Sequence, residues 1–151
     1  MSQPIDRGFV ARNEASRGRL VRLLDRLTDS DLGRVLDGWT VGTNLAHLAF
    51  WDRFLLVRWE EAAESGRDLP IDVGPPLFDL LNDTLAAQWA LLDLASVRVL
   101  VLGGAEALDA HLAALPDARV AAVQVASMAR MVDRSPHRND HLGPIERALF
   151  G

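Results

Sequence analysis

The chain has 151 residues, of which 49% are hydrophobic and 25% charged, so we expect one globular domain over residues 1–151. Its formal net charge of −5, with arginines spread among carboxylates, argues against a nucleic-acid-binding protein. Cysteine, lysine and tyrosine are absent, which excludes disulfides, cysteine-ligated zinc and catalysis by any of these three side chains.

Helical periodicity dominates the first half of the chain. Apolar residues at spacings of three, four and seven predict a helix over 6–27, and a short turn starts at 29–31. Thr40 is a good N-cap for a second helix. This helix should end near Ser65-Gly66, because glycine is favoured just past a helix end. The segment 67–76 contains three prolines and a glycine and is predicted to be a loop.

The second half is also predicted to be helical. A third helix should follow Pro75-Pro76, since proline is tolerated at a helix start. Its expected apolar face consists of Leu77, Leu80, Leu81, Leu85, Trp89 and Leu92. The run 97–102 has the composition of a strand. No partner strand is evident, so we interpret this run as the start of a fourth helix that reaches Leu115.

The segment 120–150 has a helical pattern that is interrupted at Ser135-Pro136, because proline lacks the N–H that a continuous helix needs. Either the helix kinks there, or Ser135 caps a new helix; Pro144 should bend the chain again. Four or five helices without a credible sheet predict an all-α helical bundle. No apolar run approaches the roughly 20 residues that cross a bilayer, and the N-terminus has no signal-peptide pattern. We therefore expect a cytoplasmic protein without membrane contact.

Three of the four histidines indicate a metal site. His137 and His141 are four residues apart, so on a helix they share one face with Cβ atoms about 5–6 Å apart. Both imidazoles could then reach one ion, whose bonds to nitrogen are about 2.0–2.1 Å long. His47 would supply a third ligand and leave a coordination position open for chemistry. The alternatives are two solvated histidines on a helix surface and a core histidine at position 47.

Two further residues are candidates for binding a substrate or cosubstrate, whereas no catalytic side chain is assigned. Trp51 lies one helical turn after His47 and could form an apolar wall beside a metal, although aromatic residues at helical spacing usually pack in a core. Asn13 and Arg17 interrupt the apolar face of the first helix. Arg17 could hold an anionic substrate; a solvated arginine is the alternative. The fourth histidine, His111, is expected on a helix surface.

Three short motifs resemble a known family. They are Trp39-Thr40-Val41, then Leu45-Ala46-His47-Leu48 with Trp51-Asp52 after it, and His137-x-x-x-His141-Leu142-x-x-Ile145. In this order they resemble the DinB-like superfamily, which includes bacillithiol- and mycothiol-dependent transferases. The resemblance spans nearly the whole chain. It implies a four-helix up-down-down-up bundle with short additional helices, a homodimer, and a metal site formed by His47, His137 and His141.

The resemblance also implies a reaction. We expect a divalent metal ion (Zn, Ni or Fe) that activates a low-molecular-weight thiol of the mycothiol or bacillithiol type for S-transfer to an electrophile. The absence of cysteine is consistent with this, because the sulfur would come from the cosubstrate. Two alternatives stay open. One is a non-catalytic, stress-associated metal-binding dimer, and the other is a metal-dependent hydrolase that uses bound hydroxide.

Overall fold

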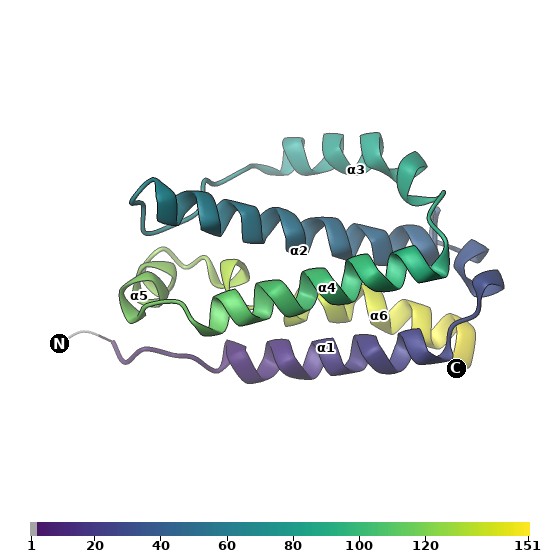
Figure 1. The fold of residues 1–151 in the computed structure, drawn as a ribbon, viewed down its shortest axis with the longest axis horizontal. Helices are drawn as coiled ribbons and strands as arrows, with labels where there is room; N and C mark the ends of the chain where they lie inside the picture. The colour runs from purple at the N-terminus through teal and green to yellow at the C-terminus, as the bar shows by residue number, and fades with distance from the viewer. Residues whose placement is uncertain (1–2) are drawn as a thin grey trace.

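The structure is a computed structural model that describes residues 3–151, and it confirms the expected all-α fold. Four helices lie side by side, with α1 and α6 running toward one end and α2 and α4 toward the other (Figure 1). Helix α3 packs outside this bundle, mainly on α2. The helices are α1 (Phe9–Arg26), α2 (Val41–Glu64), α3 (Pro75–Trp89), α4 (Leu94–Ala113), α5 (Asp117–Val125) and α6 (Ser135–Phe150).

A small hairpin corrects the expectation that the chain has no sheet. The 3-10 helix η1 (Asp29–Gly33) leads into strands β1 (Val35–Leu36) and β2 (Trp39–Thr40), which pair antiparallel. The turn residues Asp37 and Gly38 have φ of 51° and 91°. Positive φ at both central residues matches the twist of a two-residue hairpin loop, for which Asp-Gly is a favoured sequence.

The starts of α2 and α4 are fixed by side-chain caps. Thr40 Oγ1 accepts a hydrogen bond from the Thr43 amide at 3.0 Å, so α2 begins as the sequence predicts. Asp93 Oδ1 accepts from the Ser96 amide at 2.7 Å. For this reason α4 begins at Leu94, three residues before the predicted start, and the run 97–102 is helical as interpreted.

The C-terminal third departs most from the prediction of helix over 120–150. Helix α5 ends at Val125, a second 3-10 helix η2 (Ala129–Met131) follows, and α6 begins only at Ser135. Ser135 is the first residue of α6 and not its cap. Instead, Asp133 Oδ1 accepts hydrogen bonds from the amide and hydroxyl of Ser135 at 3.1 and 2.6 Å. Helix α6 then continues through Pro144 to its end.

A buried polar layer divides the core into two apolar clusters. One cluster contains the C-terminal half of α1, the start of α2 and the start of α4. The other contains the start of α1, the middle of α2, the end of α4 and α5. Between them each bundle helix carries at least one buried polar residue: Asn13, Ser16, Asp52, Asp109 and Arg138. Since buried charges must be paired, this layer constrains how the four helices align.

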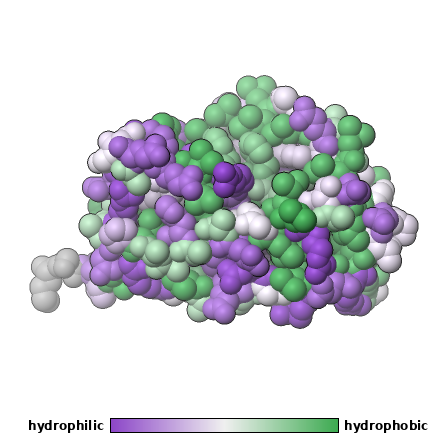
Figure 2. All heavy atoms as spheres, viewed as in Figure 1, coloured by the Kyte–Doolittle hydropathy of each residue, from purple (hydrophilic) through white to green (hydrophobic). Residues whose placement is uncertain are grey.

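Large apolar side chains are exposed on α3 and α4. Leu77 and Leu80 of α3, and Val99 and Leu100 of α4, are all exposed, and only Trp89 of α3 is buried. The expected burial of the α3 leucine face is therefore wrong for Leu77 and Leu80. Figure 2 shows hydrophobic residues gathered over α3. Within residues 3–151 no single helix is long and apolar enough to cross a membrane, although α4 and α5 together, bent by 98°, meet that length and composition test.

Candidate metal centre

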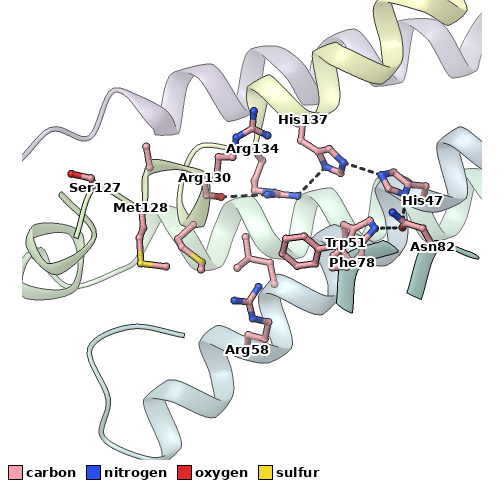
Figure 3. Close-up of a pocket in the computed structure, with 13 residues that line it drawn as sticks. His47, Trp51, Arg58, Phe78, Asn82, Ser127, Met128, Arg130, Arg134 and His137 are labelled. Carbon is pink, nitrogen blue, oxygen red and sulfur yellow. Dashed lines mark hydrogen bonds between the residues drawn. The ribbon is translucent and has the colours of Figure 1, made fainter. Parts of the chain in front are cut away.

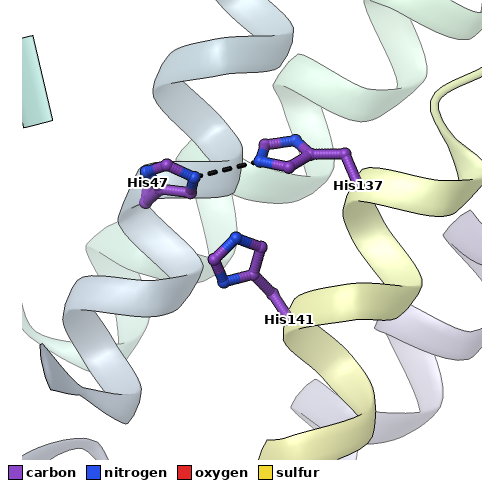
Figure 4. A group of neighbouring side chains, drawn as sticks. All are labelled: His47, His137 and His141. Carbon is purple, nitrogen blue, oxygen red and sulfur yellow. Dashed lines mark hydrogen bonds between the residues drawn. The ribbon is translucent and has the colours of Figure 1, made fainter. Parts of the chain in front are cut away.

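Three imidazole rings from two helices converge at one place in the bundle (Figure 4). His47 projects from α2, and His137 and His141 project from successive turns of α6. One ring nitrogen from each lies within 4.8 Å of the others, and His47 Nε2 is 3.0 Å from His137 Nε2. The structure thus brings together the three histidines that the sequence singles out.

Asn82 of α3 fixes the orientation of the His47 ring. Its Oδ1 accepts a hydrogen bond from Trp51 Nε1 at 2.8 Å, and an indole N–H can only donate. The same oxygen lies 3.1 Å from His47 Nδ1, so this nitrogen carries the proton. The lone pair of His47 is therefore on Nε2, the nitrogen that faces the other two histidines.

Asn44 holds His141 in the same way. Its Nδ2 donates to the carbonyl of Thr40 at 2.9 Å, which turns Oδ1 toward His141 Nδ1 at 2.8 Å. His141 Nδ1 must then donate, and its Nε2 keeps a free lone pair. An amide oxygen on the far nitrogen of an imidazole is the usual arrangement around metal-binding histidines, because it sets the tautomer and the ring angle.

His137 has a different neighbour. Arg134 Nη2 lies 3.1 Å from His137 Nδ1, and a guanidinium has no acceptor, so Nδ1 accepts. In the neutral ring the proton is then on Nε2, where it is donated to His47 Nε2. For a neutral His137 to ligate through Nε2, its proton must move to Nδ1, and Arg134 Nη2 can then no longer donate to that nitrogen.

The electrostatic environment keeps all three rings neutral. Burial lowers the pKa of His47 to about 3 and that of His137 to about 2, and the positive charge of Arg134 contributes to both shifts. Burial also lowers the pKa of His141, while the nearby Asp140 carboxylate partly opposes the shift. Neutral imidazole is the form that binds metals, so the donor set fits a divalent cation of the Zn, Ni or Fe type.

A comparison with protein families agrees with this geometry. The family model described as the DinB superfamily matches residues 12–143, which includes α2 and both α6 histidines. The chain belongs to the DinB superfamily. No match was found among the curated proteins or among the solved structures. Membership in the DinB superfamily and the clustered histidines together support a possible three-histidine metal site.

A network of buried ion pairs fixes α6 of this DinB chain against the rest of the bundle. The fully buried guanidinium of Arg138 donates to Asp52 at 2.9 Å and to Asp109 at 2.8 Å. Asp52 also pairs with Arg134 at 3.0 Å, and Asp109 pairs with Arg17 at 2.6 Å. These contacts place the α6 backbone that carries the two histidines against α2 and α4.

A cavity of about 580 Å³ opens beside the histidines. His47 and His137 are at one end, next to Trp51 and Phe78, and Met128 lies at the other (Figure 3). The break between α5 and α6 supplies part of its wall, because residues 127–131 line it. The cavity has the size of a small-molecule site and its apolar lining is typical of one.

The other residues that the sequence singled out do not all lie at the cavity or the histidine group. Trp51 lines the cavity, with its ring centroid 6.2 Å from that of His47, and its role in binding stays a prediction. Arg17 is engaged by Asp109 and is not among the residues that line the cavity, so its role in binding stays a prediction. His111 lies on α4 outside the histidine group.

Sequence reasoning missed the polar residues that support the histidines. Asn44, three residues before His47, sits one turn away on the same helix, and helical spacing could have found it. Arg134, three residues before His137, could have been found in the same way. Asn82 reaches the site from α3, and no local pattern marks it.

Proposed function

We propose that this DinB protein is a metal-dependent S-transferase, with His47, His137 and His141 as the ligands of a divalent cation. The observation that supports this most is the orientation of His47 and His141, whose Nε2 lone pairs face one point while Nδ1 is held by an asparagine oxygen. A pair of solvated histidines on a helix surface would not need either asparagine.

A divalent cation held by three neutral imidazoles would keep its full charge and would lower the pKa of a thiol that reached it. The proposed cosubstrate is a low-molecular-weight thiol, since the chain has no cysteine. The thiolate sulfur forms a bond to the electrophilic carbon, the leaving group departs with its electron pair, and the thiol proton passes to solvent.

The residues of the chain position these reactants. Asn82 and Asn44 hold the ligand rings, and the buried Arg138 network holds α6 at a fixed distance from α2. Trp51 and Phe78 form an apolar wall next to the histidines, which excludes water from the thiolate and the electrophile. We propose that Trp51 contacts the bound thiol.

The test measures metal content and turnover together. The metal-loaded protein is incubated with mycothiol or bacillithiol and 1-chloro-2,4-dinitrobenzene, and release of chloride and formation of the thioether are followed. His137→Ala should lose both metal and turnover, whereas His111→Ala, outside the group, should keep both. Full metal loading without turnover on either thiol would favour a non-catalytic metal-binding protein. Ester or amide cleavage without thiol would favour a hydrolase.

We also propose that the chain forms a homodimer through exposed apolar side chains of α3 and α4. Leu80 is 64% exposed and Val99 is 72% exposed, and both are large apolar side chains on adjacent elements of the chain. Sedimentation equilibrium should give a dimer for the wild type and a monomer for Leu80→Glu. Val125→Glu, on α5 and 88% exposed, is the matched control that should leave the dimer intact. A wild-type monomer would contradict the proposal.

A further inference from the structure

One face of α2 lines the cavity, and the chemical type of its side chains changes along the helix. His47, Trp51, Leu55 and Arg58 all line it, and their spacings of four, four and three residues place them on a single helical face. Eleven residues of α-helix correspond to about 16 Å along the axis at 1.5 Å per residue. Along this face of α2, the side chain next to the candidate metal site is His47, the next two are apolar, and the last is the guanidinium of Arg58.

The charge of Arg58 has no direct ionic partner. Its Nε and Nη2 donate to the carbonyl of Ile71, which is neutral. In the part of the chain that the structure describes, no carboxylate lies within the 4.0 Å of an ion pair with Arg58. Burial lowers the pKa of Arg58; Asp72 is near enough to oppose this shift, and Arg134 adds to it. A half-buried positive charge is therefore left for a ligand to neutralise.

The residues that line the cavity add positive charge to that of Arg58. Arg134 lines it opposite Arg58, as Figure 3 shows, and none of the lining side chains within residues 3–151 is acidic. Arg134 is already engaged by Asp52, by the Arg130 carbonyl and by His137. Arg130 also lines the cavity, but it is an exposed residue. Of Arg58 and Arg134, it is thus Arg58 that has donor capacity left over, since a guanidinium has five N–H groups and two of its three nitrogens are used here.

We infer that the cavity binds an organic carboxylate, with its anionic group against Arg58, its apolar body along Leu55 and Trp51, and its reactive end at His47 and His137. This inference rests on the proposed function and names the substrate class for the same site. The planar fork of a guanidinium matches a carboxylate, and the pair is strongest where water is partly excluded. A neutral molecule of the same shape would leave the charge of Arg58 uncompensated.

The test compares an acid with its neutral amide on metal-free protein in EDTA. Isothermal titration calorimetry measures the binding of 6-phenylhexanoate and 6-phenylhexanamide, which differ only in the charged group. The wild type should bind the carboxylate at least tenfold more tightly than the amide. Arg58→Gln should remove this preference and leave amide binding within twofold of the wild type. Arg58→Lys, which keeps the charge without the fork, should retain a reduced preference.

Arg53→Gln is the matched control, because Arg53 is exposed on the same helix and does not line the cavity. It should bind both probes as the wild type does. Equal affinity of the wild type for acid and amide, no binding of either probe, or a preference that survives Arg58→Gln would overturn the inference. Circular dichroism checks that Arg58→Gln folds. If it does not, Arg58→Lys replaces it in the test, and a preference for the acid as large as that of the wild type would overturn the inference.

The two proposals fail separately. No metal is present in this titration, so an acid preference without thiol-transfer activity would refute only the S-transferase. Turnover with equal binding of acid and amide would refute only the carboxylate site.

Discussion

Replacing Arg138 with methionine should strongly destabilise the fold. Arg138 lies between His137 and His141 in sequence, yet its side chain is fully buried and donates to Asp52 and Asp109. Methionine fills much of the same volume but supplies no donor. Two buried carboxylates would then share less positive charge, although Arg134 and Arg17 still pair with one each.

The expected loss can be bounded from these contacts. Removing one partner of a buried ion pair costs about 3–5 kcal/mol, because the other charge stays buried without compensation. For a domain of this length each kcal/mol lowers Tm by about 2–4 °C, so Tm should fall by about 6–20 °C. Guanidinium unfolding followed by far-ultraviolet circular dichroism measures the free energy directly, and an unchanged m-value would show that both states keep their compactness.

The matched control is Arg53→Met on the exposed face of α2, which should change the free energy of unfolding by less than about 0.5 kcal/mol. A loss below about 1 kcal/mol for Arg138→Met would equal that of an exposed ion pair. The reasoning that this network fixes α6 would then be wrong.

Three further predictions follow from the site and the caps. Asn82→Leu removes the acceptor for His47 and should weaken zinc binding by about 10–100-fold in a chelator competition; unchanged affinity would refute the orienting role. Because the pKa of both His47 and His137 is lowered, the unfolded chain binds protons that the folded chain does not. Stability of the metal-free protein should therefore fall as the pH drops below about 6.5, by up to about 1.4 kcal/mol per pH unit for each ring, continuing toward pH 3; equal Tm values at pH 7 and 5 would contradict this. Thr40→Ala should cost about 1 kcal/mol by removing the α2 cap, and Ser30→Ala, outside the cap, should cost less in the same denaturant titration.

Much of the helical architecture could be predicted from local sequence. The α2 boundaries follow from a capping threonine and a terminal glycine, both of which act within one helical turn. Asp37-Gly38 is a favoured sequence for a two-residue hairpin turn, but the expectation of a bundle without a sheet did not include this hairpin. The break between α5 and α6 was missed because residues 126–134 continue the apolar pattern of a helix. In the structure α5 nevertheless ends at Val125 and α6 begins only at Ser135.

The candidate site was found only in part. His137 and His141 share a face because helical geometry fixes their spacing, and His47 was linked to them by resemblance. Asn82 could not be identified, because its contact with His47 depends on how α3 packs against α2. Arg138 was equally hidden, since an arginine between two surface-like histidines has the sequence pattern of a solvated residue.

The sequence by itself determined most of the helical segments and that two imidazoles project from one face of the last helix. These properties depend on interactions within one or two turns, where the chain's own geometry sets every distance. Only the tertiary structure decided that His47 meets that pair, that asparagines from two helices select the ring tautomers, and that Arg58 faces a cavity without an acidic neighbour in its lining. Those contacts join residues far apart in the chain, so they depend on the alignment of whole helices, which the buried charges and the two apolar clusters set together.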